Sequence, residues 1–191
     1  MTLIAFGIGM LVFPVTTDVY TARAQSRLRR ELADRLLRPP AAATVPPGGS
    51  LGLIQIPRLA LDDVIVEGTD PQALREAPGH YPGTPQPCTA GNAAVAGHRT
   101  TYGKPFSRLD ELVPGDRITV VTTARRCTYE VVAAPAGRLL PHAGSAAWIT
   151  GPADWSAVGP VPGFDLTLTT CQPPGSATQR LIVRARLVTM G

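Results

Sequence analysis

The chain has 191 residues, which is enough for one folded domain with its own core and one additional segment, but not for several domains. Its 20 prolines and 19 glycines, with only 5% aromatic residues, indicate many turns between short strands and predict an all-β domain. The net charge of +4 is concentrated in residues 18–38, where six arginines outnumber three acidic residues, so the rest of the chain is close to neutral and nucleic-acid binding is discounted.

Residues 1–17 carry no charged side chain and are mostly apolar. We interpret them as a membrane anchor, although they are shorter than the roughly 20 residues that span a bilayer. A cleaved signal peptide and a buried core helix are the alternatives. The signal peptide lacks support because no basic residues precede the apolar stretch and no clear small-x-small cleavage site follows it.

Residues 18–50 are predicted to connect this anchor to the folded domain. Leu28, Leu32 and Leu36 recur every fourth residue, with arginines on the other faces, which predicts an amphipathic helix over residues 18–38. We interpret it as a solvated stalk, with lipid or partner binding as the alternative. The Pro/Ala/Gly-rich residues 39–49 have the composition of a semi-rigid linker, so the catalytic domain is expected over residues 51–191.

Short runs of apolar and β-branched residues predict the strands of this domain. The strands are expected over residues 51–56, 64–67, 92–96, 117–122, 126–133, 164–170 and 180–189. A short helix is predicted over residues 70–76, and a second one over residues 107–112 with Ser107 as its cap. His80 falls in a long irregular loop, and we interpret it as an exposed or hydrogen-bonding loop histidine. Residues 135–163 form a long insertion with one expected helical turn near Ala146.

The strand over residues 164–170 ends on Cys171, followed by Pro173, Pro174 and Gly175. These three residues cannot continue a strand and predict a turn, after which Arg180 opens the next strand. Two adjacent strands would therefore bring a thiol and a guanidinium together, although nine residues separate them in the chain.

A thiol needs a base or a proton donor before it can act as a catalyst, and the candidate is His98, at the end of the strand over residues 92–96. Alone, Cys171 would be interpreted as a packed core cysteine and His98 as a core histidine. Cysteine, histidine and arginine at the ends of three strands instead favour a cysteine transpeptidase site.

The residues around these three positions resemble the sortase family. Thr167, Leu168, Thr170 and Cys171 match the fixed positions of the family's TLxTC strand end, with the histidine upstream and the arginine downstream. The run GHRTTYGKPF and the following SRLDELVPGD are most similar to the class E sortases of high-GC Gram-positive bacteria. The resemblance covers roughly residues 51–188.

This resemblance implies a closed β-barrel of about eight strands with short helices, an N-terminal membrane helix and a catalytic domain outside the cytoplasm. Its implied function is to cleave a C-terminal sorting signal, of the Leu-Ala-x-Thr-Gly or Leu-Pro-x-Thr-Gly type, between threonine and glycine. The cleaved secreted protein is then joined to an amine of a cell-wall precursor or a pilin. The resemblance also implies that residues 135–163 form a wall of the substrate groove. No cofactor is implied.

The family's site residues carry over to matching positions of this chain. Cys171 is expected to be the nucleophile, His98 the general acid and base, and Arg180 the group that holds the substrate backbone or the oxyanion. Arg184 and Arg186 share a face with Arg180 in an ideal strand, and position next to the cysteine turn favours Arg180.

Three further residues are expected to bind substrate. Tyr102 occupies the tyrosine position of the class E TYG segment, which is thought to meet the second position of the signal. Thr169 and Thr170 directly precede the cysteine. Arg99, next to His98, is expected to point away from it and to be a surface residue.

Cys88 and Cys127 are the two remaining cysteines. An even number of non-catalytic cysteines in an extracytoplasmic domain fits a disulfide, but the sequence does not give their separation, so bonded and free forms both stay open. Zinc ligation by these cysteines and His80 lacks the usual ligand spacing, and no acidic cluster indicates calcium, so we expect no metal.

Two other classes of cysteine enzyme fit the sequence less well. An L,D-transpeptidase would carry histidine and cysteine together in an SHGC-like motif, whereas here they lie 73 residues apart, and a papain-like protease would place its cysteine near a helix start early in the domain. The non-enzymatic alternative is an inactive, anchored β-barrel binding module.

The charge pattern conflicts with an extracytoplasmic domain. Six arginines directly after an anchor over residues 1–17 would by the positive-inside rule keep the domain in the cytoplasm. We therefore expect a longer apolar segment, preceded by basic residues, that begins upstream of Met1.

Overall fold

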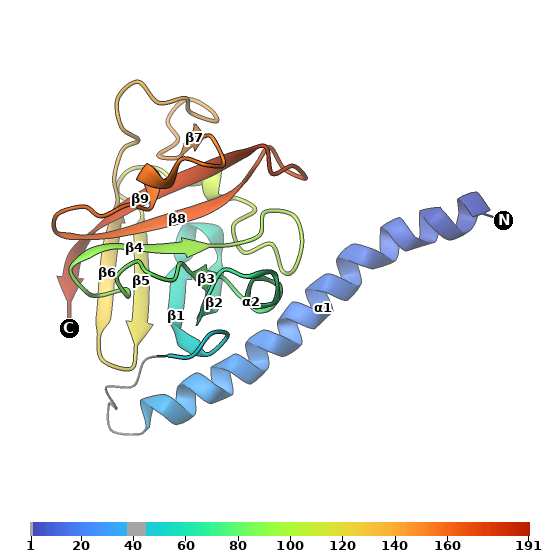
Figure 1. The fold of residues 1–191 in the computed structure, drawn as a ribbon, viewed down its shortest axis with the longest axis horizontal. Helices are drawn as coiled ribbons and strands as arrows, with labels where there is room; N and C mark the ends of the chain where they lie inside the picture. Colours follow the sequence, from blue (N-terminus) through green and yellow to red (C-terminus); the bar gives the residue numbers. More distant parts are fainter. Residues whose placement is uncertain (1, 38–44) are drawn as a thin grey trace.

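The computed structural model describes residues 2–37 and 45–191, and its centre is a closed β-barrel (Figure 1). Nine strands form one sheet in the order β6-β5-β1-β2-β3-β4-β8-β9-β7, and pairing of β6 with β9 closes a ring of eight, outside which β7 pairs with β9. The strands are β1 (Ser50–Ile56), β2 (Leu61–Glu67), β3 (Gly79–His80), β4 (Gly91–Ala96), β5 (Arg117–Thr122), β6 (Arg126–Val131), β7 (Trp148–Thr150), β8 (Phe164–Gln172) and β9 (Gln179–Met190).

The helices are few and mostly short. They are α1 (Thr2–Leu36), α2 (Pro71–Glu76) and the 3-10 turns η1 (Pro57–Leu59), η2 (Leu109–Glu111) and η3 (Trp155–Ala157). The all-β fold class and the eight-stranded barrel are confirmed, as are the strands expected from alternating patterns. The two strands that were not predicted, β3 and β7, have two and three residues, too few to show a period.

Three local predictions were wrong. His80 forms hydrogen bonds, with the Glu67 carboxylate and the Pro85 carbonyl, but it lies on β3 and not in a loop, and it is only 2% exposed. Ser107 caps no helix, since the 3-10 turn starts two residues later with no side-chain cap bond. The expected helical turn near Ala146 is absent from this described segment: Ala146 is buried directly before β7, and the turn is η3.

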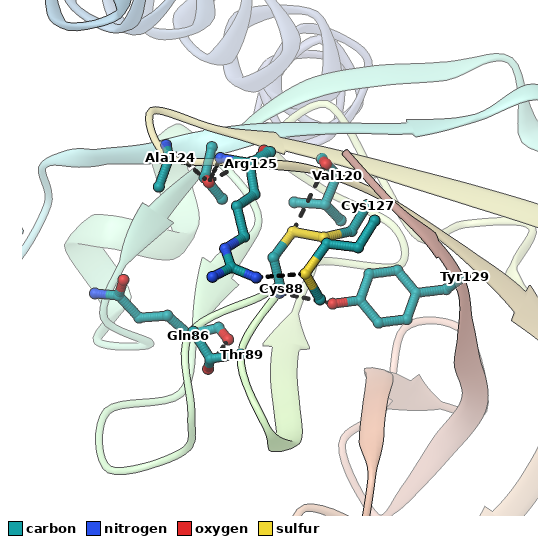
Figure 2. Close-up of a disulfide and its surroundings, with 10 residues drawn as sticks. Gln86, Cys88, Thr89, Val120, Ala124, Arg125, Cys127 and Tyr129 are labelled. Atoms are coloured by element: carbon teal, nitrogen blue, oxygen red, sulfur yellow. Dashed lines mark hydrogen bonds between the residues drawn. A yellow bond between two sulfur atoms is a disulfide. The ribbon is translucent and has the colours of Figure 1, made fainter. Parts of the chain in front are cut away.

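The barrel interior is filled by alternating residues of its strands, including Leu166 and Leu168 of β8 and Ile118 and Val120 of β5. Cys88 and Cys127 lie in this core and form a disulfide (Figure 2). The Tyr129 hydroxyl accepts a hydrogen bond of 2.7 Å from the Cys88 backbone N–H, and burial raises the pKa of that phenol. The disulfide thus fastens the loop before β4 to the edge of β6.

Helix α1 packs against the barrel, so the prediction of a solvated stalk was wrong. Leu28 and Leu32 are buried against a small apolar cluster made by Val64 and Val66 of β2, Ala73 within α2 and Ala77 directly after it. Figure 1 shows α1 passing beside α2, while its first half extends away from the barrel. The apolar face that the leucines predicted is therefore the docking face of the helix.

Part of the predicted N-terminal organisation is not described. Met1 and residues 38–44, which hold much of the expected linker, lie outside the described residues. Among the described residues, no helix combines the length and the apolar character that a bilayer crossing requires.

Candidate active site

Cys171 lies near the end of β8, directly opposite Arg180 of β9 in the antiparallel ladder. Residues that are paired in this way have side chains on the same face of a sheet, so the thiol and the guanidinium are neighbours. Cys171 is partly exposed and is not part of the disulfide. The structure thus brings together the two residues that the turn after Cys171 was expected to join.

His98 reaches the same edge because β4 runs parallel to β8. The pairing continues one residue beyond β4, where the Gly97 N–H donates to the Thr169 carbonyl at 3.0 Å. The Thr170 hydroxyl donates to the Gly97 carbonyl at 2.7 Å, which ties the strand end before His98 to the strand end before Cys171. Gly97 is required here, because an added Cβ would lie 2.5 Å from the Phe106 ring.

A cavity of about 230 Å³ collects these side chains. Its lining includes all three predicted catalytic residues, His98, Cys171 and Arg180, together with Thr169 and Thr170. Each of the three comes from a different strand or strand end, as the sequence indicated. Their catalytic roles stay predictions, but the arrangement has what thiol chemistry needs: a nucleophile, a titratable ring and a fixed cation.

Tyr102 and Arg75 shape the surroundings of the His98 ring. Burial lowers the pKa of His98 below its ordinary 6.5, and the positive charge of Arg75 lowers it further. The Tyr102 ring lies 5.1 Å from the His98 ring between centroids, and the Arg75 guanidinium lies 5.8 Å from the Tyr102 centroid. A neutral imidazole is therefore favoured, and it can accept a proton from a thiol.

Arg180 differs from the two other arginines of its strand. Its guanidinium donates to the carbonyls of Ala177 and Gln179 at 2.9 and 3.0 Å and lines the cavity with Cys171. Arg184 lies over the Trp148 ring and donates to the Ala157 carbonyl, and Arg186 pairs with Asp165. Both line a separate cavity of about 480 Å³, so the preference for Arg180 agrees with the geometry.

The predicted substrate-binding residues occupy different environments. Thr169 and Thr170 line the cavity, but both are nearly fully buried, and the Thr169 hydroxyl bonds to that of Tyr81 at 3.0 Å. Tyr102 lies beside His98 and does not line the cavity in this structure. Contact of these residues with substrate stays a prediction.

Sequence reasoning missed Arg99, and the prediction that it is a surface residue was wrong. It is 7% exposed, pairs with Asp110 at 3.1 Å and bonds to the Gln172 side chain next to Cys171. The alternation rule failed because the chain leaves the ladder after Gly97, where period two no longer applies. Arg75 and Tyr81 were also missed, since each lies in a segment without a recognisable motif.

Cys88, Cys127 and His80, whose spacing in the sequence gave no support to a zinc site, have other partners in the structure. The two sulfurs are bonded to each other, and His80 contacts Glu67 and Pro85. Within the ranges that the structure describes, no group of three or more His, Cys, Asp or Glu residues could hold a metal ion.

Comparison with known proteins agrees with this geometry. A family model described as the sortase domain matches residues 54–188. Sortase SrtE1 of Streptomyces coelicolor is 34% identical over 157 residues, which is 74% of this chain and 41% of that protein. Sortase D of Bacillus subtilis is 31% identical over 146 residues, or 74% of this chain and 66% of that protein. This chain therefore spans less than two thirds of these relatives.

Solved structures show the same fold. Sortase E of Streptomyces avermitilis superposes with a TM-score of 0.64 at 33% identity, covering 76% of this chain and 92% of that one. Sortase E1 of S. coelicolor, solved with a tripeptide in the active site, gives a TM-score of 0.66 at 31% identity and covers 77% and 93%. A Clostridium perfringens sortase D5 has a TM-score of 0.74 at 24% identity, covering 87% of this chain and 99% of that one, and supports the fold alone.

Proposed function

This chain belongs to the sortase family, and on that premise we propose that it is a cysteine transpeptidase that cleaves a C-terminal sorting signal between threonine and glycine and joins the protein to an amine. The observation that carries the proposal is the single cavity lined by Cys171, His98 and Arg180. An inactive binding module would have no need to keep a thiol, an imidazole and a guanidinium together at one opening.

The first half of the reaction is acyl transfer to the enzyme. Neutral His98 takes the proton of the Cys171 thiol, and the sulfur attacks the carbonyl carbon of the signal's threonine. The carbon–nitrogen bond to glycine then breaks, and His98 gives its proton to the leaving glycine amine. The lowered pKa of His98 suits both steps, because it keeps the ring neutral beforehand and makes the imidazolium a good acid.

The second half transfers the acyl group to an amine. The incoming amine attacks the thioester carbonyl and passes its proton to His98, and the thiolate of Cys171 leaves and regains a proton from the ring. Negative charge develops on the carbonyl oxygen in both halves. Arg180, opposite Cys171 in the ladder, offers a fixed cation that stabilises this charge.

The substrates follow from the family and from the residues around His98. Secreted proteins with a sorting signal would supply the acyl group, and a cell-wall precursor or a pilin lysine would supply the amine. A relative of this chain has been solved with a tripeptide in its active site, which supports a peptide substrate. Such a reaction occurs outside the cytoplasm, so we propose that the N-terminal region anchors the barrel at the cell membrane.

Tyr102 supports a preference for Leu-Ala-x-Thr-Gly over Leu-Pro-x-Thr-Gly. Its ring lies beside His98, where the phenol oxygen would accept a hydrogen bond from the backbone N–H of the second signal residue. Alanine has this N–H and proline lacks it. A site built around such a bond discriminates against the analogue without it.

A matched pair of signal peptides tests the proposal. Wild-type protein with an amine acceptor should process the alanine peptide faster than the proline peptide, and Tyr102→Phe should narrow the ratio of the two kcat/KM values. Tyr129→Phe is the control, since it removes a phenol oxygen from the barrel core and should leave the ratio unchanged. Turnover of neither peptide would refute the function, and faster turnover of the proline peptide would refute the preference.

A further inference from the structure

Helix α1 contacts the loop that carries Tyr102 through Asp18 and Thr21, and Asp18 makes the polar contacts. One carboxylate oxygen of Asp18 accepts a hydrogen bond from the Gly103 backbone N–H at 3.0 Å, and the other lies 3.3 Å from the Lys104 ammonium. A residue 85 positions earlier in the chain thus holds the Gly103 backbone next to Tyr102.

The loop is held by its own turn, in which the Lys104 N–H donates to the Thr101 carbonyl at 2.9 Å, and by this contact with α1. Tyr102, Gly103 and Lys104 have φ values of +51°, +72° and +41°, three consecutive residues in the left-handed region. Non-glycine residues rarely adopt this region, and they keep it only where their surroundings impose it. The Tyr102 ring therefore owes its position beside His98 in part to whatever fixes Gly103.

Thr21, one helical turn after Asp18, contacts both Arg75 of α2 and Gly103 of the loop that carries Tyr102. Its hydroxyl donates to the Arg75 carbonyl at 2.9 Å, and the side chain is nearly fully buried. A Cβ added to Gly103 would lie 2.9 Å from the Thr21 methyl group, so only a glycine lets the loop approach the helix this closely. The same helix face thus contacts the ends of both segments that flank His98.

The next turn of α1 fixes the helix on the barrel. Gln25 is 7% exposed and forms two hydrogen bonds with the backbone of Val64 on β2, at 2.8 and 3.2 Å. Leu28 and Leu32 continue this face into the apolar cluster on β2 and α2. Because these contacts set the position of the helix along the barrel, they also set where Asp18 and Thr21 meet the active-site segments.

We propose that Asp18 and Thr21 are positioning residues for transpeptidation: α1 holds the 102–104 loop and the end of α2 so that Tyr102 and Arg75 flank His98 in the geometry that accepts the signal peptide. The inference rests on the proposed function. It makes α1 a part of the catalytic unit, whose docking sets substrate selection without any contact between the helix and the substrate.

The test compares Asp18→Ala and Thr21→Val, each in the 191-residue chain, with Asp34→Ala, a control that removes an exposed carboxylate from the same helix. Asp18→Ala should lower kcat/KM for the alanine peptide about three- to tenfold, mainly through KM, because it removes a hydrogen bond to a charged group at a partly exposed site. Thr21→Val should act in the same direction, and both should narrow the alanine-to-proline ratio. The melting temperatures should stay close to that of the control.

Hydrogen exchange provides a readout that does not depend on turnover. Amides of residues 101–104 should exchange faster in Asp18→Ala than in Asp34→Ala, whereas those of β8 should be unchanged. Unaltered exchange in this loop, or an unaltered KM and peptide ratio in both variants, overturns the positioning role. If the wild type processes neither peptide, the proposed function fails, and the exchange data still decide whether α1 orders the loop.

Discussion

The three cysteines of this chain lie in two regions of the barrel that differ in solvent exposure, in the bonding of the sulfur and in the side chains around it. Cys88 and Cys127 are at most 2% exposed, surrounded by apolar core residues, and bonded to each other. Cys171 is partly exposed, free, and shares a cavity with a histidine and an arginine. The comparison teaches that the position of a cysteine in the fold decides which groups surround its sulfur, and therefore which chemistry is open to it.

Loss of the groups beside Cys171 should have the largest effect. His98→Ala and Arg180→Ala should each lower kcat/KM for the signal peptide by about a hundredfold or more, because each removes one catalytic function. Their unfolding midpoints in urea should stay near the wild-type value, since both side chains lie at the cavity rather than in the core. Arg126→Ala, on the exposed end of β6, is the matched control and should retain full activity. Near-normal turnover in His98→Ala would remove it from the mechanism.

The core pair should show the opposite behaviour. Replacing both Cys88 and Cys127 by alanine should lower the free energy of unfolding by about 2–4 kcal/mol, because a crosslink across 39 residues no longer restricts the unfolded chain. Urea unfolding measures this loss. At a temperature where the variant remains folded, its kcat/KM should equal that of the wild type. A large loss of activity in the folded variant would contradict the claim that the core disulfide contributes to stability and not to catalysis.

The smallest effect concerns the charge beside His98. Burial and Arg75 both hold the pKa of His98 below 6.5, and removing a positive neighbour favours the imidazolium. Arg75→Gln should therefore raise the pKa of His98 toward, but not beyond, 6.5, because burial still opposes the charge. An NMR titration of the ring in a Cys171→Ala background measures this without interference from the thiol. A pKa that falls or stays constant would contradict the assigned cause.

The region around Cys171 was predictable because its information is local. The run of strand-forming residues, the cysteine and the Pro-Pro-Gly turn are contiguous, and the register Cys171↔Arg180 follows from a short turn between antiparallel strands. His98 at the end of β4 also came from a local pattern. What joins them, the parallel pairing of β4 with β8, is not local and was not predicted from the sequence.

The docking of α1 and the burial of Arg99, both near His98, could not be predicted from local sequence patterns. Leu28 and Leu32 showed that one face of α1 is apolar, but the surface that covers this face is built jointly by Val64, Val66 and α2. No single segment of the chain contains the whole of that surface, so no local pattern in the sequence shows it. Arg99 is a second case, because the partners of this buried side chain, Asp110 and Gln172, lie on different elements. Both failures concern contacts between segments that are far apart in the chain, and hydrophobic periodicity within one segment gives no information about such contacts.

The central claim is that Cys171 forms a thioester with the threonine of a sorting signal, and intact-mass spectrometry tests it most directly. Wild-type protein incubated with the Leu-Ala-x-Thr-Gly peptide and no amine acceptor should gain the mass of the acyl fragment. Proteolysis should locate this mass on the segment that contains Cys171, and hydroxylamine should remove it. Cys171→Ala protein should gain nothing. An adduct that persists in Cys171→Ala, or peptide cleavage by the wild type with no adduct at Cys171 under any trapping condition, would contradict the account.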